Sequence, residues 1–81
     1  MLTQYIRAAM AHASYEILPD DSTYYGAIAQ APGVWANKPT LEECRAELES
    51  ALEDWILLSI AEGLPLPTID GLELVVKREV A

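Results

Sequence analysis

Few side chains in this sequence could do chemistry, and the first to consider are its single histidine, His12, and its single cysteine, Cys44. Imidazole is the usual general base near neutral pH, but catalysis also needs a nucleophile and an orienting group, and the alanines around His12 supply neither. Cys44 lies near the start of a predicted helix, where thiols can be reactive, yet it also falls in the apolar stripe of that helix, which favours a buried thiol. We therefore predict that neither residue is catalytic and that the protein is not an enzyme.

Carboxylates are the remaining chemical groups, and they could in principle bind a metal ion. The pairs Glu42/Glu43 and Glu53/Asp54 are adjacent on a predicted helix, so their side chains point about 100° apart and do not converge on one Mg²⁺. One histidine and one cysteine cannot build the usual zinc sites. The four glycines are too scattered for a phosphate-binding loop. The sequence predicts no metal and no cofactor.

The length and charge of the chain limit its domain count, its partners and its location. Eighty-one residues suit one domain, residues 1–81, and 52% apolar with 22% charged residues is ordinary for a folded core. Thirteen acidic residues against five basic ones argue against nucleic-acid binding and favour a basic partner. A secretory signal and an apolar run of about 20 residues are both absent, so we expect a cytoplasmic protein without a membrane span.

The first half of the chain predicts a short helix followed by three strands. Residues 2–11 are alanine-rich with apolar side chains at helical spacing, and residues 13–18 change to two-residue alternation. Further strands are predicted over 24–31 and 34–37, separated by the Pro32-Gly33 turn. Three short strands in succession predict an antiparallel meander.

A long helix follows, and its two ends carry the clearest local signals. Thr40 can cap the first turn by accepting from the amide of Glu43, while the Glu43 side chain can reach back to the Thr40 amide. Gly63 stands where a left-handed residue can end the helix. The predicted buried stripe comprises Leu41, Cys44, Leu48, Ala51, Leu52, Trp55 and Leu58 or Ser59.

Residues 72–80 alternate apolar and polar side chains, which predicts a fourth strand at the edge of the sheet. The expected fold is therefore α+β, with one small sheet of about four strands, one long helix packed on it and a short helix at the start. A core of this size is marginal, so we also expect a homo-oligomer, a dimer or a tetramer.

Interface candidates are apolar and aromatic. Residues 55–61 are apolar around nearly the whole helix, and Ile56, Leu57 and Ile60 lie off the predicted stripe, which favours contact with a second chain. Tyr24, Tyr25 and Trp35 on the predicted strands are candidates too, although such residues more often pack a sheet.

The order of these features resembles the HicB-type antitoxin family. The resemblance is carried by residues 24–36, with tyrosines and the Pro32-Gly33 turn, by the threonine-capped segment 40–44, and by residues 52–55 and 63–67. It implies a β-β-β-α-β unit akin to part of a ribonuclease H fold, and a small basic RNA-cleaving toxin of the HicA type as the partner. Many members carry a C-terminal DNA-binding segment, which this sequence lacks, so we expect a short member without transcriptional control.

The residues that match the family motif are Pro32, Gly33, Thr40 and Glu43. We interpret them as turn and cap residues of the scaffold. Gly63 is likewise interpreted as a cap residue, and Trp55 is predicted to lie in the core. The ribonuclease H likeness invites a nuclease hypothesis, but Glu16 is the only acidic residue in the first three predicted strands, so we predict no metal-dependent cleavage. The sequence leaves two functions open, which are an antitoxin that occludes a basic toxin and a solitary homo-oligomer with a structural or ligand-sensing role.

Overall fold

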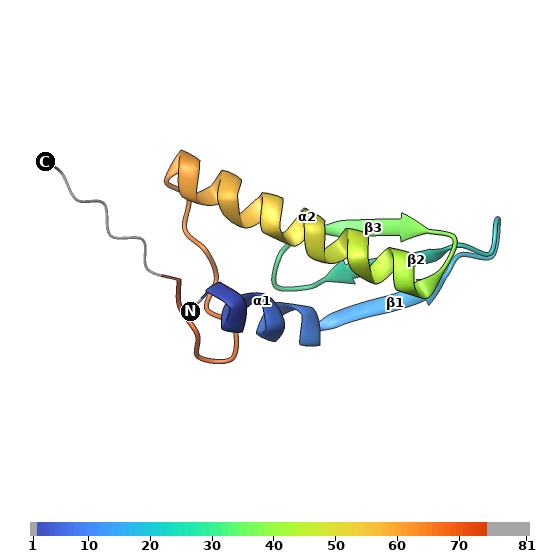
Figure 1. Cartoon of the computed structure of the whole chain (residues 1–81), viewed down its shortest axis with the longest axis horizontal. Helices are drawn as coiled ribbons and strands as arrows, with labels where there is room; N and C mark the ends of the chain where they lie inside the picture. Colours follow the sequence, from blue (N-terminus) through green and yellow to red (C-terminus); the bar gives the residue numbers. More distant parts are fainter. Residues whose placement is uncertain (1, 75–81) are drawn as a thin grey trace, which may run out of the picture.

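The computed structural model describes residues 2–74 and forms two helices and one antiparallel sheet (Figure 1). The elements are α1 (Leu2–Ala11), β1 (Ala13–Ile17), β2 (Tyr24–Ile28), β3 (Trp35–Lys38) and α2 (Leu41–Glu62). The prediction of a small α+β fold is confirmed, with three strands in the described sheet.

Helix α1 is held by two side chains at helical spacing. Tyr5 and Ala9 are four residues apart and are both fully buried. The Tyr5 hydroxyl donates a 2.7 Å hydrogen bond to the carbonyl of Pro67, and burial raises the pKa of this phenol, so it stays protonated as the donor. Helix α1 is therefore tied to the segment that follows α2.

The strands form a meander in the order β1-β2-β3. Tyr24 of β2 pairs with Ile17 of β1 on one side and with Lys38 of β3 on the other. The second strand ends at Ile28 rather than at residue 31, because the amide of Ala31 turns back to donate to the Ile28 carbonyl. The predicted meander is confirmed, with the first two strands shorter than predicted and the third shifted by one residue.

Helix α2 begins and ends at the predicted caps. Thr40 has extended backbone angles, and its hydroxyl oxygen accepts from the Glu43 amide at 3.1 Å. The Glu43 carboxylate accepts from the Thr40 hydroxyl at 3.0 Å, whereas the sequence predicted that it would reach the Thr40 amide. Gly63 adopts φ 69°, and its amide and that of Leu64 bond back to the carbonyls of Ile60 and Ser59.

The buried stripe of α2 differs from the predicted one at Leu41, which is 46% exposed, and in the C-terminal half of the helix. It runs in steps of four residues through Cys44, Leu48, Leu52 and Ile56, and continues to Ser59. Each four-residue step rotates the stripe by about 40° around the helix, so it drifts away from Trp55, which is only partly buried. The prediction that Ile56 lies off the stripe is wrong, because this half of α2 packs against α1 as well as against the sheet.

Helix α2 and strand β1 both pack closely against β2 at Gly26. A Cβ atom added there would lie 2.9 Å from the Tyr15 ring and 3.1 Å from Cys44 Sγ. The Cys44 thiol in turn donates to the carbonyl of Ala36 at 3.6 Å. A side chain at position 26 would therefore push the helix away from the sheet.

The segment after α2 returns to the start of the chain (Figure 1). Ile69 is 1% exposed and forms an isolated antiparallel bridge with Leu72 around Asp70 and Gly71, both of which have positive φ. Of the predicted fourth strand, Leu72 makes only this bridge and residues 75–80 lie outside the described residues. No helix within residues 2–74 is long and apolar enough to cross a membrane.

Candidate interaction surfaces

The structure places the two residues considered first for catalysis on different parts of the fold. Cys44 is fully buried on the side of α2 that packs against the sheet. His12 lies at the end of α1, where its Nε2 is 2.7 Å from Asp70 Oδ1, and this contact ties the C-terminal segment to the junction between α1 and β1. Among residues 2–74, no three His, Cys, Asp or Glu side chains gather as metal ligands would.

One face of the sheet is exposed. Gly26 and its paired residues Tyr15 and Ala36 face α2, so alternation turns their neighbours to the opposite face. We call this the open sheet face, and it is formed by Ser14, Glu16, Tyr25, Ala27, Trp35 and Asn37. Four of these six, namely Ser14, Glu16, Trp35 and Asn37, are exposed.

An aromatic pair lies at the centre of the open sheet face. The rings of Tyr25 and Trp35 stack with centroids 6.2 Å apart and 17° between their planes, and Trp35 is 58% exposed. Tyr24 faces the other way and packs against the core. The structure therefore brings together two of the three predicted aromatic candidates and separates the third.

Side-chain hydrogen bonds fix one end of this face. The Asn37 amide donates to the Thr23 hydroxyl at 2.7 Å and to the Tyr24 carbonyl at 2.9 Å. The hydroxyl and the amide of Thr23 donate to Asp21, and these bonds hold the pKa of the Asp21 carboxyl below its ordinary value. The turn between β1 and β2 is thus anchored to β3.

The outer surface of α2 is strongly acidic. It carries seven exposed carboxylates and one basic residue, Arg45. The only ion pair of α2 within residues 2–74 is a loose one, at 4.0 Å, between Glu47 and Lys38. We call these carboxylates the acidic face, and they are Glu42, Glu43, Glu47, Glu49, Glu53, Asp54 and Glu62.

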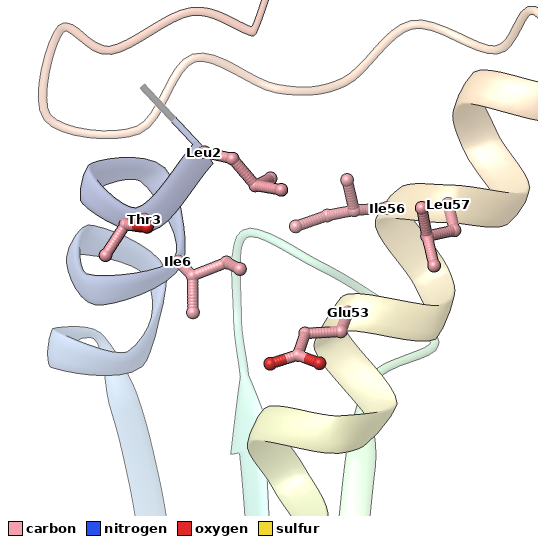
Figure 2. A pocket seen from close by; sticks show the side chains of 6 residues that line it. All are labelled: Leu2, Thr3, Ile6, Glu53, Ile56 and Leu57. Carbon is pink, nitrogen blue, oxygen red and sulfur yellow. The ribbon is translucent and has the colours of Figure 1, made fainter.

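A groove of about 280 Å³ separates the C-terminal half of α2 from α1 (Figure 2). Six residues line this α1–α2 groove: Leu2, Thr3, Ile6, Glu53, Ile56 and Leu57. Leu57 is 61% exposed at its rim, whereas Ile56 is 1% exposed at its base, and Ile60 is partly buried against the core.

Of the interface candidates predicted on α2, Ile56 and Leu57 line the groove and Ile60 does not, while Glu53 and the three residues of α1 were not predicted. The signal was present, because Leu2 and Ile6 are four residues apart and lie beside the buried pair Tyr5 and Ala9. Their connection with Leu57 depends on how the two helices pack, which no local pattern contains.

Comparisons with known proteins agree with this fold. The sequence model of a family described as UPF0150-like matches residues 4–67. The crystal structure of TTHA0281 from Thermus thermophilus is similar, with a TM-score of 0.88 and 42% sequence identity over 95% of this chain and 95% of that one. No curated protein gives a significant match.

Proposed function

The chain belongs to the UPF0150-like family, and on that premise we propose that it is a non-catalytic antitoxin of the HicB type, which neutralises a small basic RNA-cleaving toxin by covering its surface. The HicB-type resemblance of residues 24–36, 40–44, 52–55 and 63–67 falls inside the matched range 4–67. The meander and α2 supply the first four elements of the β-β-β-α-β, partly ribonuclease H-like unit expected of that type.

The acidic face of α2 is the observation that carries this proposal. A toxin that binds RNA presents basic residues to the phosphate backbone. Seven exposed carboxylates on one rigid helix attract such a surface from a distance and compete with RNA for it. Inhibition then needs no chemistry, only occupancy of the surface that RNA would use.

The test is co-purification of the tagged protein from its native cells, followed by mass spectrometry and a ribonuclease assay of what elutes with it. We expect a small basic protein in stoichiometric amount whose ribonuclease activity is silent in the complex and returns on separation. Recovery of the protein alone, or of a partner without ribonuclease activity, would refute the antitoxin assignment.

Charge-matched variants then show whether the acidic face is the surface used. Glu49→Gln removes one charge from the acidic face, and Glu16→Gln removes one from the open sheet face. We expect the first to slow association more than the second, with a difference that shrinks as salt is added. Equal effects of the two changes would contradict binding through α2.

A second candidate function is a solitary homo-oligomer, and the exposed Trp35 favours it. Tyr25 and Trp35 form an aromatic surface on a face whose only acidic residue is Glu16, so two copies with a net charge of −8 would meet little charge repulsion there. Light scattering at micromolar concentration should give at least a dimer mass for the parent and a lower one for Trp35→Ser. A salt-independent monomer mass for the parent would exclude this candidate.

A further inference from the structure

The α1–α2 groove combines apolar walls with one carboxylate. Figure 2 shows Leu2 of α1 and Ile56 of α2 pointing toward each other across the gap, with the Glu53 carboxylate turned toward α1. Leu2 is 46% exposed and Leu57 is 61% exposed, so both offer apolar surface to an incoming group. Among residues 2–74, no lysine or arginine lies within ion-pair distance of Glu53. The groove therefore has an apolar floor and an unpaired negative charge at one wall.

We propose that this groove binds an arginine side chain presented by a basic protein partner. Arginine carries a three-carbon apolar stem and a weakly hydrated planar cation that a carboxylate can bind through two parallel hydrogen bonds. The stem would lie against Leu2, Ile6 and Leu57, while the guanidinium reaches Glu53. This inference rests on the proposed function for the partner's identity, and it names the point at which that partner is anchored.

The next section of the same interhelical surface limits where the cation can lie. Arg7 of α1 and Arg45 of α2 line a neighbouring hollow together with Glu49. These two arginines repel an incoming cation. Glu53 lies one helical turn farther along α2, in the α1–α2 groove, and no arginine lines that groove. The charges therefore favour the Glu53 end of the groove and fix one position for the anchoring side chain.

A second copy of this chain is a poorer occupant. Each copy has a net charge of −8 and only five basic residues, and two of these, Arg7 and Arg45, line the neighbouring hollow. A basic partner instead gains from the acidic face of α2, which contributes Glu53 to the groove.

The first experiment uses a probe that contains only the proposed anchor. The ¹⁵N-labelled protein is titrated with n-butylguanidinium and, separately, with the neutral analogue n-butylurea, and amide shifts are followed by NMR. We expect saturable shifts at the groove residues for the cation, with a dissociation constant on the order of millimolar. The neutral analogue should bind more weakly, because it lacks the charge that Glu53 recognises.

Neighbouring residues on α2 supply matched controls. Glu53→Gln should weaken probe binding about fivefold, the fold-change at the upper end of exposed ion-pair energies. Asp54→Asn removes the same charge from the adjacent residue, which does not line the groove, and should leave binding nearly unchanged. Leu57→Ser should also weaken binding, while Leu58→Ser, at a residue of similar exposure outside the groove, should not.

Three outcomes would overturn the proposal. The first is a set of shifts spread along α2 that Asp54→Asn reduces as much as Glu53→Gln, and the second is equal binding of n-butylurea. The third is a dependence of the groove shifts on protein concentration without probe, which would place a second copy there. Because the probe needs no toxin, its binding can succeed when no basic partner co-purifies, so failure of the proposed function and failure of this site are separately visible.

Discussion

Replacing Gly26 with alanine tests how closely α2 is packed on β2. The added Cβ atom would lie 2.9 Å and 3.0 Å from two carbons of the Tyr15 ring and 3.1 Å from Cys44 Sγ. Optimal separation between non-bonded carbons is about 3.5 to 4.0 Å, so each contact is short by roughly half an ångström or more. Cys44 is fully buried and the Tyr15 ring is packed against the core on part of its surface, so neither can move away freely.

The magnitude follows from the cost of overpacking a core. An extra methyl group of this kind destabilises by about 1 to 3 kcal/mol, and the loss of unfolded-state freedom on replacing glycine offsets about 0.4 to 1 kcal/mol of that. A chain of this size is stable by about 4 to 12 kcal/mol in total. The middle of these two ranges, about 2 kcal/mol less about 0.7 kcal/mol, leaves a net cost of about 1.3 kcal/mol. Since 1 kcal/mol shifts the Tm of such a domain by about 4 to 8 °C, we expect a loss of roughly 5 to 10 °C for Gly26→Ala.

Thermal unfolding followed by circular dichroism measures this loss, and Cys44→Ala provides the internal check. Removing Sγ opens space for the new methyl group, so Gly26→Ala should cost less in the Cys44→Ala background, with a coupling of about 0.5 to 3 kcal/mol. A Gly26→Ala variant as stable as the parent, or strictly additive effects of the two changes, would show that the helix is not in close contact with the sheet at this point.

Three further predictions concern the helix and the first turn of the sheet. Ile56→Ala should lower the free energy of unfolding by about 2 to 5 kcal/mol, whereas Leu57→Ala should change it by no more than about 0.5 kcal/mol, because only Ile56 is buried. Equal losses for the two variants in thermal unfolding would contradict this difference in burial. Thr40→Ala should cost about 1 kcal/mol and speed hydrogen exchange at the Glu43 amide, and unchanged exchange would argue against the cap. The pKa of Asp21 is lowered in the fold, so its contribution to stability is present above the ordinary value of 3.8 and is lost as pH falls through the lowered one. In a plot of the urea-unfolding midpoint against pH, the Asp21→Asn variant should therefore lose less stability at acid pH than the parent does. Curves of the same shape at acid pH for variant and parent would contradict this prediction.

Local signals were enough to predict most elements of the fold. The Thr40 cap and Gly63 fixed both ends of α2, and the change from helical spacing to two-residue alternation after residue 11 located β1. These predictions succeeded because each depends on neighbours a few residues apart, whose conformational preferences act before any tertiary contact forms.

Predictions that depended on the packing of one element against another were less successful. Ile56 and Trp55 are adjacent, and a stripe drawn from spacing alone chose Trp55 for the core because it assumed that α2 packs only on the sheet. The buried Ile69, in a segment of turns, carried no periodic signal at all. The α1–α2 groove was missed for the same reason, since Leu2 and Leu57 line one groove only when the two helices lie together.

The return of the chain to α1 has a consequence for the order in which this protein folds and opens. Successive strands pair with each other and α2 follows directly, so most of the structure can form from neighbours in the sequence. The contacts of Tyr5 with Pro67 and of His12 with Asp70 span 62 and 58 residues. Forming them closes much longer loops than pairing the strands of the meander, so it costs more conformational entropy. We expect α1 and the segment around residues 64–72 to be the last parts to dock and the first to detach, as one cooperative unit. Because one wall of the α1–α2 groove belongs to that unit, the groove exists only while α1 and residues 64–72 are docked.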